Sequence, residues 1–286
     1  MKVFIQTDME CTAGIVNFVD YCLPPESRKY AELNCGRGKY YEHGKHLVTM
    51  EVNAAVEGLL EGGATEILVS DSHGFGGLHA SEIHSAARVL TGANLPIFEG
   101  LDESCDAAIM IGQHAKANTD GGHLAHSGSF SREDWILNGK SIGEIEWFLI
   151  AAAYHNVPVV LISGDVAACC EARELIPSIE TVEVIEGVKF GSQARMTPVQ
   201  AINLNVAAVH TSPEKAREWI KKSAKKCLRK VDSIKRYWVE PPYEMIRITR
   251  AWENASACKC VKTNSDYMTL IRDTDFEYTQ IENYPA

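Results

Sequence analysis

Short apolar runs alternate with amphipathic stretches over the first two thirds of the chain. Val3-Phe4-Ile5-Gln6-Thr7 is such a run, and the polar Asp8 ends it. Residues 45–61 then place apolar side chains at helical spacing, until Gly62-Gly63 ends the pattern. Because a strand–helix–strand order favours parallel pairing, the repeat predicts an α/β fold around a mostly parallel sheet. The predicted strands are 3–7, 66–70, 107–111, 157–162 and 181–185, and the predicted helices are 45–61, 143–155, 166–175 and 213–231.

Three other segments follow a different pattern. Trp135-Ile136-Leu137 precedes Asn138-Gly139, a dipeptide typical of a tight hairpin turn. Residues 17–44 are polar, aromatic and proline-containing without a clear period, which indicates a functional loop or lid. Residues 243–286 mix strand-like pieces with polar ones. We therefore predict an α/β domain over 1–195 that carries the site. A smaller C-terminal α+β lobe over 196–286 would pack on it and contribute to oligomerisation.

Composition and charge narrow the classes of partner. The 286 residues hold 28 Lys and Arg against 38 Asp and Glu, for a net charge of −10. A chain this acidic has no general attraction for nucleic acid or for an anionic membrane, and neither is expected as a partner. The basic run from Lys221 to Lys235 lacks interleaved aromatic residues for base stacking and is interpreted as a solvated helix face.

No apolar run reaches the roughly 18–20 residues of a transmembrane helix. The nine cysteines include no C-x-x-C pair, and we expect reduced thiols in a cytoplasmic protein.

Metal-ligand residue types follow each of the first three predicted core strands. Asp8 and Glu10 follow the first, Asp71-Ser72-His73 the second, and Gln113-His114 the third. The carboxyl ends of parallel strands share one edge of the sheet, where α/β proteins build their sites. Carboxylates and imidazoles that converge there suit zinc or a similar divalent ion. A single Asp at a strand end is more often a cap or turn residue, so the pattern leaves both interpretations open.

Two further segments carry acids and bases close to these positions. Glu144 opens the helix predicted after the hairpin, where it is either a first-turn acid favoured by the helix dipole or a further carboxylate ligand. His123 and His126 lie in a glycine-flanked loop after the third strand. Loop histidines are often surface residues, but beside a metal they are candidates for acid–base groups.

At these residues the chain resembles the DppA-type D-aminopeptidases, a family of binuclear zinc metallopeptidases. The resemblance covers most of residues 1–200 in the same order. It rests on the motifs Asp8-Met9-Glu10, Ser70-Asp71-Ser72-His73, Gly112-Gln113-His114-Ala115-Lys116-Ala117, His126-Ser127, Gly143-Glu144, Val157-Pro158-Val159, Gly164-Asp165 and Glu174-Leu175-Ile176-Pro177.

The resemblance implies a three-layer α/β fold and a ring-like homodecamer with its active sites facing an enclosed channel. It assigns two zinc ions or other divalent metals to each chain, and it makes His126 the essential active-site histidine. In our own interpretation of this ligand set, Asp8 would bridge the ions, with Glu10 and Glu144 at one and His73 and His114 at the other. The implied activity is a metallo-aminopeptidase that hydrolyses short peptides, including peptides with D-residues. The implied metal ligands are Asp8, Glu10, His73, His114 and Glu144.

Three features depart from the family's pattern. Cys11 stands where the family usually has glycine, segment 17–44 is longer than expected, and the loop from His114 to His126 is one residue longer. These departures bear on the substrate more than on the metal chemistry. Two alternatives therefore stay open: another metal-dependent amidohydrolase, such as a creatininase-like enzyme that opens a cyclic amide, and a non-catalytic metal-binding assembly protein.

Overall fold

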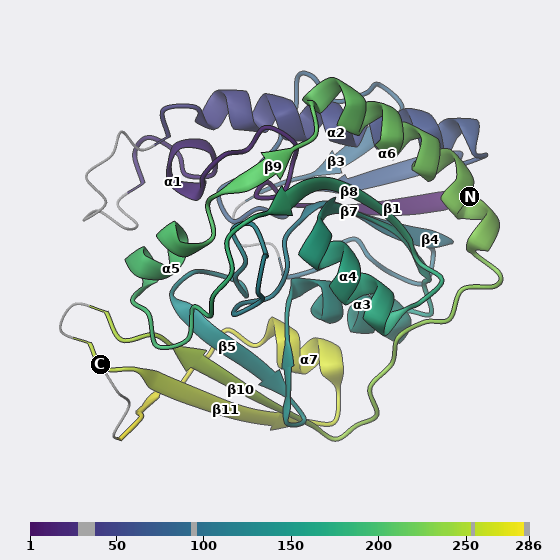
Figure 1. Ribbon diagram of the computed structural model, residues 1–286. Coiled ribbons are helices and arrows are strands. Elements are labelled where there is room, and N and C mark those ends of the chain that lie inside the picture. The colour runs from purple at the N-terminus through teal and green to yellow at the C-terminus, as the bar shows by residue number, and fades with distance from the viewer. Residues whose placement is uncertain (28–37, 93–95, 253–254, 283–286) are drawn as a thin grey trace.

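The core of the molecule is a mostly parallel sheet. The computed structural model describes residues 1–27, 38–92, 96–252 and 255–282 (Figure 1). Seven strands follow the order β3-β2-β1-β4-β7-β8-β9, and every neighbouring pair is parallel except β8 with β9. The strands are β1 (Lys2–Thr7), β2 (Glu66–Ser70), β3 (Ala87–Leu90), β4 (Ala107–Gln113), β7 (Val159–Asp165), β8 (Glu180–Gly187) and β9 (Ala208–His210).

Helices cover both faces of this sheet. In Figure 1, α2 (Tyr41–Glu61) and α6 (Pro213–Cys227) lie above it, and α3 (Glu144–Tyr154) and α4 (Val166–Leu175) lie below. The central strands β4 and β7 are buried along their whole length, as expected for parallel strands covered on both faces. The predicted three-layer α/β arrangement is therefore confirmed. Two short helices, α1 (Phe18–Tyr21) and α5 (Pro198–Leu204), lie in the connections.

A second, antiparallel sheet lies against the lower helical layer (Figure 1). Its order is β12-β11-β10-β5-β6, and α7 (Tyr267–Arg272) follows β11. Asn138 and Gly139 both have positive φ angles (48° and 81°), which confirms the predicted hairpin between β5 and β6. This sheet takes strands from both sides of residue 195, and the proposed division into two domains stays a prediction. Its strands are β5 (Arg132–Leu137), β6 (Lys140–Ile142), β10 (Tyr243–Thr249), β11 (Cys258–Asn264) and β12 (Thr279–Gln280).

Several elements differ from the sequence-based expectation. Strands β3 and β9 and helix α5 were not predicted; both strands are short, lie at the edges of the sheet and are only partly buried, so they lack a clear apolar pattern. Helix α2 begins at Tyr41 rather than at residue 45. Helix α6 ends at Cys227, and a 3₁₀ turn continues it over Leu228–Lys230. Segment 17–44 contains α1 and the start of α2, while its residues 28–37 lie outside the described part of the chain.

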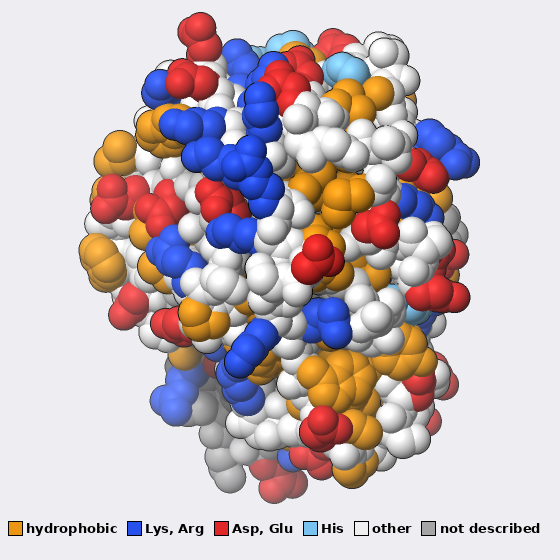
Figure 2. Space-filling model, turned by 90° about the vertical axis from the view of Figure 1, so that its right-hand side faces the viewer, with side chains coloured by type: hydrophobic (Ala, Val, Ile, Leu, Met, Phe, Trp, Pro, Cys, Tyr) orange, Lys and Arg blue, Asp and Glu red, His pale blue; other side chains and the backbone are white. Residues whose placement is uncertain are grey.

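The ion pairs of α6 agree with the interpretation of the basic run from Lys221 to Lys235 as a solvated helix face. Lys221 and Lys225 of α6 form ion pairs with Glu57 and Glu61 of α2. On the face seen in Figure 2, acidic side chains lie among the lysines and arginines. Within the described residues, no helix combines the length and apolar character that crossing a membrane requires. All cysteines in the described segments are free thiols.

Candidate metal centre

The predicted site residues meet at the carboxyl edge of the three neighbouring strands β2, β1 and β4. Asp8 and Glu10 follow β1, His73 follows β2 and His114 follows β4. Glu144 is the first residue of α3. His114 Nε2 lies 3.3 Å from Asp8 Oδ2 and 3.3 Å from Glu144 Oε1. His73 Nε2 lies 3.5 Å from Glu10 Oε1. Asp8, Glu10, His73 and His114 are all buried.

The turn that carries Asp8 and Glu10 is anchored to the end of β4. Asp8 N–H donates to the carbonyl of Ile111 (2.9 Å), and Cys11 N–H donates to that of Gly112 (3.0 Å). Gly112 has a φ of +80°, and a Cβ atom there would lie 2.2 Å from the carbonyl oxygen of Asp8. Only glycine combines this conformation with such a close approach. The turn with Asp8 and Glu10 is thus fixed through backbone to the end of β4, which His114 follows.

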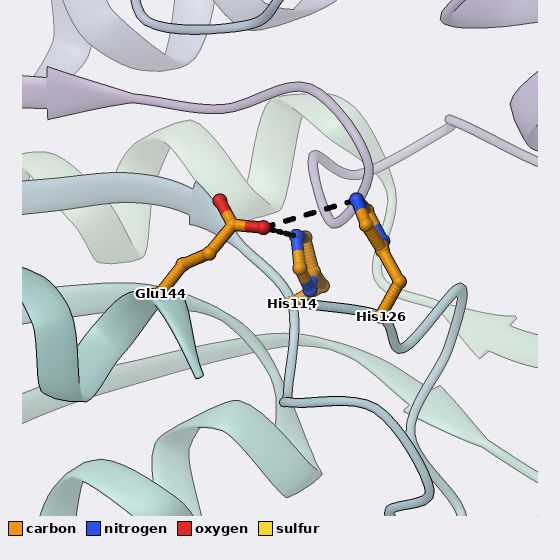
Figure 3. Close-up of side chains that lie close together, drawn as sticks. All are labelled: His114, His126 and Glu144. Carbon is orange, nitrogen blue, oxygen red and sulfur yellow. Dashed lines mark ion pairs between the residues drawn. The ribbon is translucent and has the colours of Figure 1, made fainter. Parts of the chain in front are cut away.

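His114 and His126 stack face to face beside Glu144 (Figure 3). Their ring centroids are 3.9 Å apart, and His126 Nε2 lies 3.9 Å from both Glu144 Oε1 and Glu10 Oε1. His114 Nδ1–H donates to the carbonyl of Ala115 (2.8 Å), and His126 Nδ1–H donates to that of Leu124 (2.9 Å). Because a carbonyl can only accept, both rings carry a proton on Nδ1 and turn Nε2 toward the carboxylates.

The electrostatics of the cluster favour a cation. Burial and the neighbouring charge of Glu10 raise the pKa of Asp8 well above its usual value. Burial would lower the pKa of His114, but Glu144 and Asp8 outweigh it and raise that pKa well above the ordinary value. His114 Nε2 is buried and has no hydrogen-bond partner in the described part of the chain. The ligand atoms of Asp8, Glu10 and His114 lie within 4.8 Å of one another, as do those of His114, His126 and Glu144. Three carboxylates and imidazole nitrogens at this spacing fit divalent metal ions.

His126 differs electrostatically from His114. Burial and the charge of His114 lower the pKa of His126 to about 4, so its ring is neutral at pH 7. Phe130 stacks on the His126 ring at 4.5 Å between centroids, and Phe18 contacts its edge at 6.2 Å. A neutral imidazole held between aromatic rings, with Nε2 directed at the carboxylates, can accept a proton there.

A cavity of about 210 Å³ opens onto this cluster. Phe18, Ile97 and Trp147 contribute apolar walls to its lining. A second cavity of about 240 Å³ shares His73, Glu144 and Trp147 with the first and continues toward Ser70 and Asp71. Gly128 N–H donates to Glu144 Oε1 (2.7 Å), which fixes that carboxylate at the cavity wall. The cluster therefore lines both cavities, each of which has room for a small molecule.

The structure thus brings together the five predicted metal ligands and His126, while the other loop histidine, His123, makes different contacts. His123 is fully buried, and its Nε2–H donates to the carbonyl of Ile15 (3.1 Å) rather than facing the carboxylates. Sequence analysis missed the cavity walls Phe18 and Trp147. Phe18 belongs to the aperiodic segment 17–44, and Trp147 has the apolar character of an ordinary core residue on a helix.

Comparison with known proteins identifies the family. The family model described as D-aminopeptidase matches residues 1–205. The chain belongs to the D-aminopeptidase family. It is 31% identical to the D-aminopeptidase of Bacillus subtilis (strain 168) over 206 residues, which are 70% of this chain and 69% of that protein. The family resemblance inferred from the motifs is therefore confirmed.

A solved structure supports the same fold over nearly the whole chain. The Zn-dependent D-aminopeptidase DppA from Bacillus subtilis, described as a self-compartmentalizing protease, superposes with a TM-score of 0.75. The match covers 95% of this chain and 94% of the other at 24% identity. The family's sequence match ends at residue 205, but the structural likeness extends through the second sheet.

Proposed function

We propose that this member of the D-aminopeptidase family is a metal-dependent aminopeptidase that hydrolyses short peptides, including peptides with D-residues. The observation that carries the proposal is the convergence of Asp8, Glu10, His73, His114 and Glu144 beside the two cavities. The related DppA is named as Zn-dependent, and zinc is the metal that this mixed carboxylate and imidazole set would take.

The five side chains would hold two zinc ions per chain. The pairs His73–Glu10 and His114–Glu144 lie close in space, so we propose that each pair serves one ion and that Asp8 is shared. This partition differs from the expectation drawn from the sequence, which joined Glu10 with Glu144. When bound, the ions would supply Lewis-acid chemistry, lowering the pKa of a water molecule and polarising the peptide carbonyl.

His126 would move protons in the reaction. Its Nδ1–H is held by the carbonyl of Leu124, so Nε2 is the nitrogen that exchanges a proton. Because the ring is neutral at pH 7, it can take a proton during attack on the carbonyl and return it to the leaving amine. Phe18 and Phe130 would keep bulk water away from this ring. The alternative role as a nucleophile predicts a covalent acyl intermediate that mass spectrometry of quenched reactions would detect.

The proposal also covers the oligomeric state of the protein and its location in the cell. The related DppA is described as self-compartmentalizing, and we propose a closed homo-oligomer, a decamer, in the cytoplasm. Light scattering should then give a mass well above that of a dimer, and the enzyme should cleave di- to tetrapeptides but not casein. A monomer that degrades casein would contradict the enclosed site.

Metal removal tests the function directly. Dialysis against a chelator should abolish dipeptide hydrolysis, and zinc should restore it; full activity of metal-free protein would refute the mechanism. Asp8→Asn should lower the metal content measured by plasma mass spectrometry more than any other ligand change. Asp275→Asn, an exposed position, serves as the control and should retain metal and activity.

The α-amino group separates this proposal from its rivals. An aminopeptidase should cleave a D-alanine dipeptide and reject its N-acetylated form. A creatininase-like enzyme would instead open a cyclic amide that has no free α-amine. A chain that binds zinc but hydrolyses none of these compounds would be the non-catalytic metal-binding protein.

A further inference from the structure

A buried carboxylate that is not among the predicted ligands lies at the junction of β7 and α4. Asp165 is the last residue of β7, and its side chain has no exposed surface. One oxygen, Oδ1, caps α4 by accepting a hydrogen bond from Ala168 N–H (2.8 Å). The other oxygen, Oδ2, accepts a hydrogen bond from His123 N–H (2.7 Å). Capping alone therefore accounts for only half of the bonds that this side chain makes.

Helix capping does not require a carboxylate at this position. Serine caps a helix about as well as aspartate and carries no charge. Removing a carboxylate from water is costly unless hydrogen bonds compensate. Because Oδ2 reaches across to a different segment, the second bond is the one that distinguishes aspartate from serine here. The role of this second bond depends on what the backbone of His123 contacts.

Besides Asp165, the turn after β1 and strand β8 also contact the segment around His123. His123 O accepts a hydrogen bond from the Cys11 thiol (3.2 Å), and His123 Nε2–H donates to the carbonyl of Ile15 (3.1 Å). Both partners belong to the turn that begins with Asp8 and Glu10. On the opposite side, Gly187 packs so closely that a Cβ atom there would lie 2.1 Å from the carbonyl of Gly121. The segment is thus fixed from several sides, and Asp165 supplies its charged anchor.

His126 takes its orientation from the same stretch of backbone. The residue after His123, Leu124, has a φ of +49°, and its carbonyl accepts the Nδ1–H of His126 (2.9 Å). A rotation of the 123–124 backbone would therefore turn the imidazole and move Nε2 away from Glu10 and Glu144. We propose that Asp165 is a positioning residue for the peptidase reaction, acting through the backbone of His123 and Leu124 on the ring of His126.

Asp165→Ser separates positioning from capping, on the premise that the chain is the proposed peptidase. Serine can still cap α4, but its single oxygen leaves His123 N–H without its acceptor. We expect kcat for a dipeptide to fall about 10- to 100-fold, the scale of a small misplacement of a catalytic group. KM and the zinc content should change less than twofold, because the proposed ligands and the cavity walls are untouched.

Asp266→Ser is the matched control. Asp266 also caps a helix, α7, with one oxygen on Thr269 N–H, while its other oxygen accepts from Tyr154 OH. It lies outside the site, so this variant should keep kcat within twofold of the original chain. Both variants are assayed at 25 °C with zinc present, after thermal melts confirm that they are folded at that temperature.

Three results would overturn the inference. The first is an unchanged kcat in Asp165→Ser, and the second is a loss of zinc that accounts for the lost activity, since Asp165 would then act on the metal site. The third is an equal loss of kcat in Asp266→Ser. If Asp165→Ser does not fold, Asp165→Asn is measured by the same criteria, because its amide can cap the helix but cannot accept both bonds. An original chain without peptidase activity would instead refute the proposed function.

Discussion

Glu51 gives the fold a pH dependence that can be measured apart from activity. It lies on α2, is 1% exposed, and accepts a hydrogen bond from Ala13 N–H (2.9 Å). Among the described residues, its second oxygen finds no hydrogen-bond partner. Burial raises the pKa of Glu51 from 4.5 to about 8, against the opposing effects of Ala13 N–H and Arg217. We expect Glu51→Gln to remove this pH dependence, because the amide fills the same space without a charge.

The sign and the size of this pH dependence of the unfolding free energy follow from proton linkage. Between pH 4.5 and about 8 the folded chain keeps the Glu51 proton, whereas the unfolded chain releases it. The free energy of unfolding therefore falls by about 1.4 kcal/mol per pH unit as pH rises, and it levels off above the folded pKa. Over this interval the total is about 5 kcal/mol, an upper bound for a buried carboxyl that moves toward water when it ionises. The stability contribution is fully present below pH 4.5 and is lost as pH rises through about 8.

Urea unfolding of both chains at equal concentration, at pH values from 5 to 9, measures the effect. The difference in unfolding free energy between Glu51→Gln and the original chain should grow with pH and become constant near pH 9. Glu57→Gln on the same helix is the control, because Glu57 is 46% exposed and pairs with Lys221 at the surface. Parallel pH profiles for Glu51→Gln and the original chain would refute the reasoning.

Two further predictions concern the site itself. His126→Ala should keep both metals and lose about 10²–10⁴-fold in kcat, the usual worth of general acid–base catalysis; loss of metal in this variant, measured by plasma mass spectrometry, would instead make His126 a ligand. Gly112→Ala would place a Cβ atom 2.2 Å from the Asp8 carbonyl oxygen at a φ of +80°. We therefore expect this variant to have a lower melting temperature and a lower zinc content. Gly139→Ala, in an open turn, is the control and should leave the zinc content unchanged.

The sequence predicted the centre of the fold and the cluster of site residues for the same physical reason. Core parallel strands are continuous apolar runs, and the residues that follow Thr7, Ser70 and Gln113 must share one edge once those strands pair in parallel. Glu144 was placed by the glycine before it and by the start of its helix. Each of these signals comes from residues that are neighbours in the sequence, and the folded structure retains the strand ends and the helix start that they predict.

The remaining features depend on contacts that no local pattern encodes. The stacking of His114 on His126 requires the loop between them to fold back, and the backbone of His123 is held by Asp165, which lies 42 residues further along the chain. Pairing of β10 with β5 joins segments about 110 residues apart, and no local pattern in either segment specifies which strand is its partner. Short edge strands such as β3 are only partly buried and were therefore missed.

Because the second sheet includes strands from the C-terminal region, the site is completed late in the synthesis of each chain. Residues 127–143, between His126 and Glu144, run out through the β5–β6 hairpin, and that hairpin pairs with β10. Arg250, just after β10, is buried and donates to the carbonyls of Phe130 and Arg132. A nascent chain thus carries all six site residues long before it has the strand that holds two of them in register. Peptide hydrolysis would begin only after the C-terminal region has been synthesised, although that region contributes none of the six residues.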